Sequence, residues 1–157
     1  MEIKLVKGVK LEDLVDELKD KLQILNDRAY VKGIPFIVTC TGRSYFIQKA
    51  LYAQGRETLG VVNKLRKEAG LWIIGKTDNK YKVTWTMKSK HIITSVHPKS
   101  EAFDLAVLKN NKPTWDIKAD VNDNEINDYM ELAYIGKEIG LKPGAFWGSP
   151  DYPHYEI

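Results

Sequence analysis

Residues 88–106 read KSKHIITSVHPKSEAFDLA, and together with the last seven residues, DYPHYEI, they decide how the rest of the chain is interpreted. These two stretches contain all three histidines of the protein, His91, His97 and His154. They also contain two aspartates in apolar or aromatic surroundings, Asp104 and Asp151. Three nitrogen or oxygen ligands with a free carboxylate nearby are typical of a catalytic zinc site, in which one metal position stays open for water.

The pattern around His97 predicts an antiparallel hairpin. Residues 89–95 and 102–108 are strand-like, and the His-Pro-Lys-Ser segment between them has turn chemistry. Side chains of matching parity share one face of a hairpin, so a histidine on its first strand and Asp104 on its second can meet one metal ion. His154 is the remaining distant histidine, and Asp151 lies close enough to it to take a proton from water at the metal.

Hydrophobic periodicity and turn residues predict helices and short strands in the rest of the chain. Helices are expected at residues 9–30, 45–54, 58–70 and 128–139. Besides the hairpin, strands are expected at residues 34–41, 71–74, 81–87 and 154–157. We therefore predict an α+β fold, in which a small antiparallel sheet carries the zinc site and packs against several helices.

Length and composition are those of an ordinary globular domain, and we expect residues 1–157 to form a single one. The net charge of +3 is far from that of a nucleic-acid binder, although it would suit an anionic polymer such as the bacterial cell wall. Cys40 is the one cysteine, which excludes an internal disulfide, and its apolar neighbours predict a buried packing role. Because the N-terminus lacks an uninterrupted apolar segment, we expect no signal peptide and no membrane insertion.

The motifs that contain these residues resemble those of the LAS-type zinc peptidases, the VanY-like superfamily of D-Ala-D-Ala carboxypeptidases and phage L-alanyl-D-glutamate endolysins. The family signature is matched by Ser89-Lys-His91, by Ser100-Glu-Ala-Phe-Asp104, with serine for the usual glycine, and by Asp151-Tyr-Pro-His154. The endolysin branch is also matched by Thr41-Gly-Arg43-Ser, Val83-Thr-Trp-Thr, Phe146-Trp-Gly and Pro153-His-Tyr-Glu156. The resemblance is strongest over residues 35–157, and it implies a fold like that of hedgehog proteins and D,D-peptidases.

Two histidines fit the first ligand position of this signature. His97 has the family's usual spacing to Asp104, whereas His91 has the usual upstream context, Val-Thr-Trp-Thr-x-x-Ser-x-His. A ligand at His91 requires a hairpin longer by six residues, an even insertion that preserves strand parity. Because His97 precedes Pro98 in the most turn-like segment, we favour His91 and keep His97 as the alternative.

The resemblance implies a role for each matched residue. The Zn²⁺ ligands would be His91, Asp104 and His154. Asp151 would act as general base on the water at the metal and then protonate the leaving amine. Arg43 would bind a substrate carboxylate and help to stabilise the oxyanion, with Gln48 and Ser89 as further substrate-binding residues. Glu156 is either a support for a ligand histidine or a solvated acid.

The implied function is that of a phage or prophage endolysin, a bacteriolytic zinc metallopeptidase that hydrolyses the L-Ala–D-Glu bond of peptidoglycan stem peptides. We expect a monomer without a separate cell-wall-binding domain, made in the host cytoplasm and released to the wall through a holin-type pore. One alternative is a D,D- or L,D-carboxypeptidase of the same superfamily. A further alternative, a non-catalytic zinc or cell-wall-binding module, would require the base to be missing, but Asp151 is present.

Residues 120–131 have the spacing of an EF-hand calcium loop. The oxygen ligands of such a Ca²⁺ site would come from Asp120, Asn122, Asn124, Ile126, Asp128 and Glu131. Glu125 stands where the sharp turn of the motif normally has glycine. The alternative interpretation is an acidic, Asn-rich connection that caps the following helix.

Overall fold

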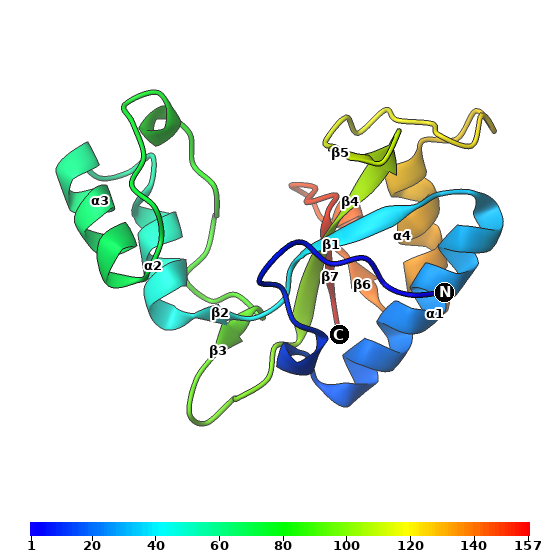
Figure 1. Cartoon of the computed structure of the whole chain (residues 1–157), viewed down its shortest axis with the longest axis horizontal. Helices are drawn as coiled ribbons and strands as arrows, with labels where there is room; N and C mark the ends of the chain where they lie inside the picture. Colours follow the sequence, from blue (N-terminus) through cyan, green and yellow to red (C-terminus); the bar gives the residue numbers. More distant parts are fainter. The chain divides into compact units, whose positions relative to one another are not determined.

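The computed structural model describes all 157 residues, and the chain divides into two compact units (Figure 1). Unit 1 consists of Met1–Gly42 and Lys99–Ile157, and unit 2 consists of Arg43–Pro98. The elements of unit 1 are η1 (Leu11–Asp13), α1 (Asp16–Lys32), β1 (Phe36–Cys40), β4 (Ala102–Lys109), β5 (Lys112–Thr114), α4 (Asp128–Glu138), β6 (Lys142–Pro143), η3 (Gly144–Phe146) and β7 (His154–Glu156). The elements of unit 2 are β2 (Arg43–Ser44), α2 (Tyr45–Ala53), α3 (Leu59–Glu68), η2 (Asp78–Lys80) and β3 (Ile92–Ile93).

The sheet of unit 1 is antiparallel throughout and is built around β4. Its strand order is β1-β4-β7-β6, and β5 pairs with the far end of β4. Asn110 and Asn111 join β4 to β5 with φ angles of 52° and 60°. Positive φ at both central residues is the geometry of a two-residue hairpin turn, which asparagine tolerates well.

The hydrophobic core of unit 1 lies between one face of this sheet and helices α1 and α4 (Figure 1). Successive strand residues point to opposite faces, so Phe103, Leu105 and Val107 of β4 enter the core together. Leu18, Leu22 and Leu25 recur at helical spacing and cover them from α1; Tyr129, Leu132 and Ile135 do so from α4. The alternate residues of β4, such as Asp104, therefore point to the other face of the sheet, away from this core.

In unit 2, helices α2 and α3 pack against each other, and a short parallel pairing joins β2 to β3. Both helices begin at a hydroxyl cap. The side chain of Ser44 accepts a hydrogen bond from the backbone of Ile47, and Thr58 accepts one from Val61. Such caps satisfy backbone N–H groups that have no partner within a first helical turn.

The α+β prediction is confirmed, but the predicted hairpin of residues 89–95 and 102–108 is wrong. Residues 102–108 do form β4, which takes β1 at one edge and β7 and β5 at the other. No edge remains for residues 89–95. Only β3 forms there, and it pairs with β2 instead.

The strands predicted at residues 71–74 and 81–87 are also absent from the structure. Side chains from α3 and from the connection between α2 and α3 take hydrogen bonds that a partner strand would have supplied. Asn63 of α3 bonds both the N–H and the C=O of Ile74, at 2.8 and 2.9 Å. Arg56 donates to the carbonyl of Thr84 at 3.0 Å. In these two segments, a strand-like composition was therefore not enough to form a paired strand.

The helix predicted at residues 9–30 begins later than expected, because η1 and an extended segment precede α1. Leu14 is fully buried and bridges to Ser100, and the backbone of Val15 donates to the carbonyl of Ser100 at 3.0 Å. This pairing with Ser100 keeps Leu14 and Val15 in an extended conformation. The helices predicted at 45–54, 58–70 and 128–139 are confirmed within one or two residues at each end.

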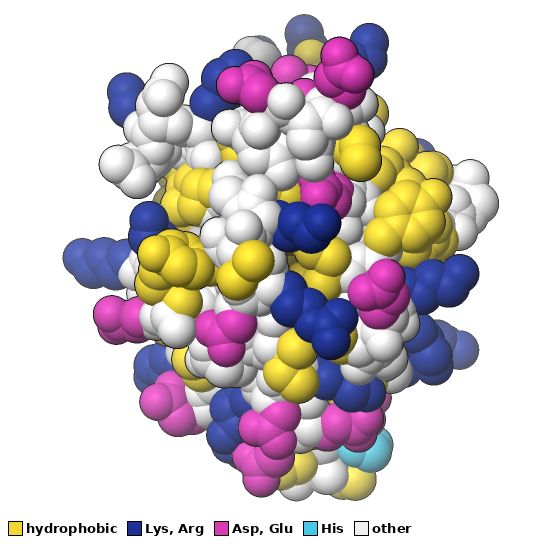
Figure 2. Space-filling model, turned by 90° about the vertical axis from the view of Figure 1, so that its right-hand side faces the viewer, with side chains coloured by type: hydrophobic (Ala, Val, Ile, Leu, Met, Phe, Trp, Pro, Cys, Tyr) yellow, Lys and Arg dark blue, Asp and Glu magenta, His cyan; other side chains and the backbone are white.

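The surface shown in Figure 2 carries Lys and Arg side chains interspersed with Asp and Glu, and hydrophobic side chains gather in small groups between them. Charges of the two signs are mixed over this face rather than separated into fields, as the small net charge suggests. None of the helices combines the length and the apolar composition that crossing a membrane requires.

Gly136 of α4 allows this helix to approach β7 closely, which leads to a first prediction. A Cβ atom at this position would lie 2.8 Å from Cε1 of Tyr155, a fully buried ring stacked on Phe103. We expect Gly136→Ala to lower the free energy of unfolding by about 1–3 kcal/mol, as overpacking does. Denaturant titration would measure this change.

Gly60 of α3 provides the matched control, because a Cβ atom there would meet nothing within 4 Å. Gly60→Ala should raise the free energy of unfolding by up to about 1 kcal/mol, since alanine is the better helix former. Equal stabilisation by both substitutions would contradict the close packing of α4 on Tyr155.

Candidate metal centre

Antiparallel pairing aligns Cys40, Asp104 and His154 in one row across three strands of unit 1. Cys40 of β1 is opposite Asp104 of β4, and Asp104 is opposite His154 of β7. Opposed residues of antiparallel strands point to the same face of a sheet. This face is the one opposite the hydrophobic core, because Phe103 and Leu105, on either side of Asp104, both belong to the core.

The imidazole of His154 lies between two carboxylates. Its Nδ1 atom is 3.2 Å from Oδ1 of Asp104, and its Nε2 atom is 3.0 Å from Oε2 of Glu156. The side chain of His154 is 7% exposed, and the side chains of both acids are 18% exposed. The three side chains are therefore largely buried, and each keeps a small exposed fraction.

This arrangement fits a zinc ion held between Nδ1 of His154 and Oδ1 of Asp104. Zinc bonds to nitrogen and oxygen are about 2.0–2.2 Å long, so two ligand atoms of a tetrahedral ion lie about 3.3 Å apart. The observed separation of 3.2 Å is close to this value. Glu156 then accepts from the second ring nitrogen, which orients the ring and fixes its tautomer.

A tight turn places Asp151 next to the row. The N–H of Asp151 donates to the carbonyl of Gly144 at 2.9 Å, and the N–H of His154 donates to the carbonyl of Asp151 at 3.2 Å. Asp151 is exposed, so water has access to it. The ring of Trp147 lies 4.9 Å from the imidazole of His154, between centroids, and covers part of it.

In unit 2, the backbone joins His91 to Arg43. The N–H of Arg43 donates to the carbonyl of His91 at 2.7 Å, within the pairing of β2 with β3. Ser89 holds the preceding turn, because its hydroxyl accepts from the N–H of His91 at 3.2 Å. His91 is buried, whereas His97 is exposed in a turn in which it bonds Thr94.

Gln48 fixes the guanidinium of Arg43 in unit 2. Its Oε1 atom accepts from Nη1 of Arg43 at 3.3 Å. Its Nε2 atom donates to the hydroxyl of Thr84 at 3.1 Å and to the carbonyl of Thr86 at 2.8 Å. Because Gln48 is fully buried, it is suited to positioning Arg43 rather than to direct contact with a substrate.

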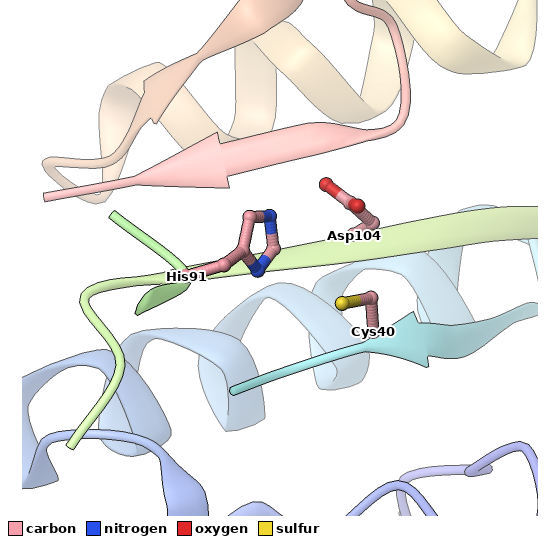
Figure 3. A group of neighbouring side chains, drawn as sticks. All are labelled: Cys40, His91 and Asp104. Carbon is pink, nitrogen blue, oxygen red and sulfur yellow. The ribbon is translucent and has the colours of Figure 1, made fainter. Parts of the chain in front are cut away.

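Sequence reasoning did not assign roles to three residues at this centre. Cys40 was expected to be buried filler, but it is half-buried and stands opposite Asp104. Figure 3 draws the side chains of Cys40 and Asp104 on their neighbouring strands and labels His91 of unit 2 as well. The roles of Gly144 and Trp147 depend on three-dimensional packing; the only available signal was that Trp147 belongs to the Phe146-Trp-Gly motif.

The predicted calcium-loop residues all belong to unit 1. They occupy the connection that leads into α4 and the first turns of that helix. Asp128 and Glu131 are buried, whereas Asn124 and Ile126 are exposed.

This chain is similar to known peptidoglycan endopeptidases, although no family model matches it. The peptidoglycan L-alanyl-D-glutamate endopeptidase CwlK of Bacillus subtilis (strain 168) is 29% identical over 147 residues, which cover 92% of this chain and 74% of CwlK. The crystal structure of the L-Ala D-Glu endopeptidase ChiX of Serratia marcescens covers 99% of this chain and 91% of its own, with a TM-score of 0.56 and 13% identity. At that identity the likeness to ChiX shows the fold.

Gly144 leads to a second prediction. A Cβ atom at this position would lie 2.4 Å from the carbonyl oxygen of Asp151 and 3.1 Å from Cβ of His154. We expect Gly144→Ala to displace this turn and to weaken zinc binding about 10-fold or more, as changes to groups that orient a ligand do. Competition with a chromogenic chelator would measure the affinity. Gly148→Ala is the control, because nothing lies within 4 Å of its Cβ position, and an equal effect there would count against the role of Gly144.

Proposed function

We propose, from the LAS-type peptidase family that both likenesses support, that this protein is a zinc-dependent peptidoglycan peptidase that cleaves the L-Ala–D-Glu bond of stem peptides. The observation that carries the proposal is the pairing of His154 with Asp104 at 3.2 Å, with Glu156 on the second ring nitrogen. The identity of 29% with CwlK over most of this chain supports the bond specificity.

The proposed zinc ligands are Asp104 and His154 of unit 1 and His91 of unit 2. Asp104 and His154 are already held at ligand spacing by the pairing of β4 with β7. Burial and the bond to Ser89 favour His91 over the exposed His97 as the third ligand. Cys40 is also a residue type that can bind zinc, but in this proposal the fourth position belongs to water.

Zinc, when bound, makes a water molecule nucleophilic at neutral pH and polarises the scissile carbonyl. Asp151 takes the proton of the attacking water and later returns it to the leaving amine. Arg43 binds a substrate carboxylate, because a planar guanidinium can donate two parallel hydrogen bonds to it. Gln48 holds that guanidinium in place from behind.

The endolysin setting is part of the proposal and is supported by the motifs shared with that branch, such as Thr41-Gly-Arg43-Ser and Phe146-Trp-Gly. In it, the protein acts as a monomer on the wall after release from the host cytoplasm. The carboxypeptidase alternative has the same zinc chemistry and differs in the bond that is cut.

The two candidate histidines supply a third prediction with a control from the same chain. His91→Ala should lower zinc affinity about 100-fold or more and abolish hydrolysis, because one of three protein ligands is lost. His97→Ala should leave both unchanged. Equilibrium dialysis with zinc and turbidity assays on purified cell walls would measure these effects. The reverse pattern would assign the ligand to His97.

Asp151 supplies the fourth prediction. Asp151→Asn should keep zinc bound at wild-type affinity but reduce hydrolysis by about 10²–10⁴-fold, because the amide cannot accept the proton. The exposed Asp20→Asn substitution on α1 is the control and should leave the rate unchanged. Near-wild-type hydrolysis by Asp151→Asn would refute the proposed base.

Digestion of purified cell walls by the unaltered protein identifies the peptidoglycan bond that is cut. Mass spectrometry of the fragments should show free L-Ala termini on the glycan side and new D-Glu amino termini on the released peptides. Release of single D-Ala residues would instead identify a carboxypeptidase. A preparation that binds zinc and cuts neither bond would support a non-catalytic module.

A further inference from the structure

A second cluster of oxygen-bearing side chains lies where the chain enters α4. Asp128 is its centre, with 0% of its surface exposed. One carboxylate oxygen, Oδ2, accepts from the N–H of Val121 at 2.8 Å. The other, Oδ1, is buried and has no hydrogen-bond partner. A buried carboxylate oxygen without a donor is costly, and a cation is the partner that would satisfy it.

Asn122 contributes a second oxygen of the same kind. Its Nδ2 atom donates to the carbonyl of Lys32 at 2.9 Å and lies 3.4 Å from Oε2 of Glu131, which defines how the amide is oriented. Its Oδ1 atom is buried and also lacks a hydrogen-bond partner. Two buried oxygens of two nearby residues therefore lack donors, whereas most buried polar groups of proteins are satisfied.

The charges around Asp128 also favour a bound cation. The carboxylates of Asp120 and Glu131 are close enough to the buried carboxylate of Asp128 for their negative charges to repel it. The compensating positive charge is small, because Nζ of the exposed Lys32 lies 3.9 Å from Oε1 of Glu131. Three carboxylates and the one amine of this ion pair leave the cluster with an excess of negative charge.

The backbone of the loop also has the required shape. Glu125 adopts a φ angle of 66°, so it supplies the left-handed turn for which glycine is usual. The carboxylate of Asp120 accepts from the N–H groups of Asn124 and Glu125, at 3.1 and 2.9 Å. The cap of α4 is provided by Asn127, which accepts from Met130 at 2.9 Å. A capping role therefore does not account for the other acidic and amide groups.

We propose that this loop binds one calcium ion. The ligand oxygens come from the side chains of Asp120, Asn122, Asn124, Asp128 and Glu131 and from the carbonyl of Ile126, a set of the kind that Ca²⁺ selects. The ion fastens the end of α1, through Asn122 and Lys32, to the beginning of α4. It stabilises unit 1 and is independent of the proposed peptidase chemistry.

Calorimetry on the full chain tests this site. The protein is dialysed into buffer freed of divalent cations, reloaded with one equivalent of zinc, and titrated with CaCl₂ or with MgCl₂. We expect one Ca²⁺ to bind per chain, Mg²⁺ to bind at least about tenfold more weakly, and the melting temperature to rise with calcium concentration. Absence of calcium binding at millimolar concentration, or equal affinity for Mg²⁺, would overturn the assignment.

Charge-neutralising variants locate the ion. Glu131→Gln and Asp128→Asn should each weaken calcium binding at least about tenfold, since each removes a charged ligand. Asp120→Asn, at a half-buried position, gives the same test if a buried variant fails to fold. Glu138→Gln is the control, because this carboxylate lies on the same helix but is exposed and pairs with Arg28. Equal affinity in all four variants would place the ion elsewhere and refute the proposal.

Discussion

The antiparallel pairing of β4 with β7 is the constraint on which the proposed centre depends. It puts Asp104 directly opposite His154, and it puts Phe103 directly opposite Tyr155. The first pair faces away from the core, whereas the second pair stacks within it, with ring centroids 5.3 Å apart. Because side chains alternate along a strand, a shift of one residue would exchange the polar pair and the aromatic pair. Core packing therefore sets the register that the metal ligands need.

Two glycines allow neighbouring elements to approach β7 closely. Gly136 lets α4 approach the ring of Tyr155, and Gly144 lets η3 approach the turn from Asp151 to His154. The two contacts act on opposite faces of the same three-residue strand. Its position is thus fixed from the core side by packing and from the other side by backbone hydrogen bonds.

Elements with strong local signals could be predicted from the sequence. The leucine spacing of α1 and the buried run of β4 are examples. The pairing of β4 with β7, which places Asp104 opposite His154, was not predicted, because no local pattern specifies which strands pair. Residues 89–95 were misread because their β-branched composition is a local signal, whereas the choice of a strand's partner is a tertiary one. The edges of β4 were already occupied by β1, β7 and β5. The irregular register between Val38 and Cys40 brings Cys40 opposite Asp104. Amino-acid composition does not predict such an irregularity.

The core of unit 1 has a consequence for how the proposed zinc ion would be acquired. Small zinc domains fold only when the metal joins their ligands. Here Asp104 and His154 are positioned by strands whose alternate residues are anchored in a hydrophobic core that contains no metal ligand. This half of the coordination sphere is thus preorganised, and the free energy of zinc binding is not consumed in folding it. Metal uptake by such a scaffold is a docking step into an assembled fold, so cycles of loading and stripping should be reversible.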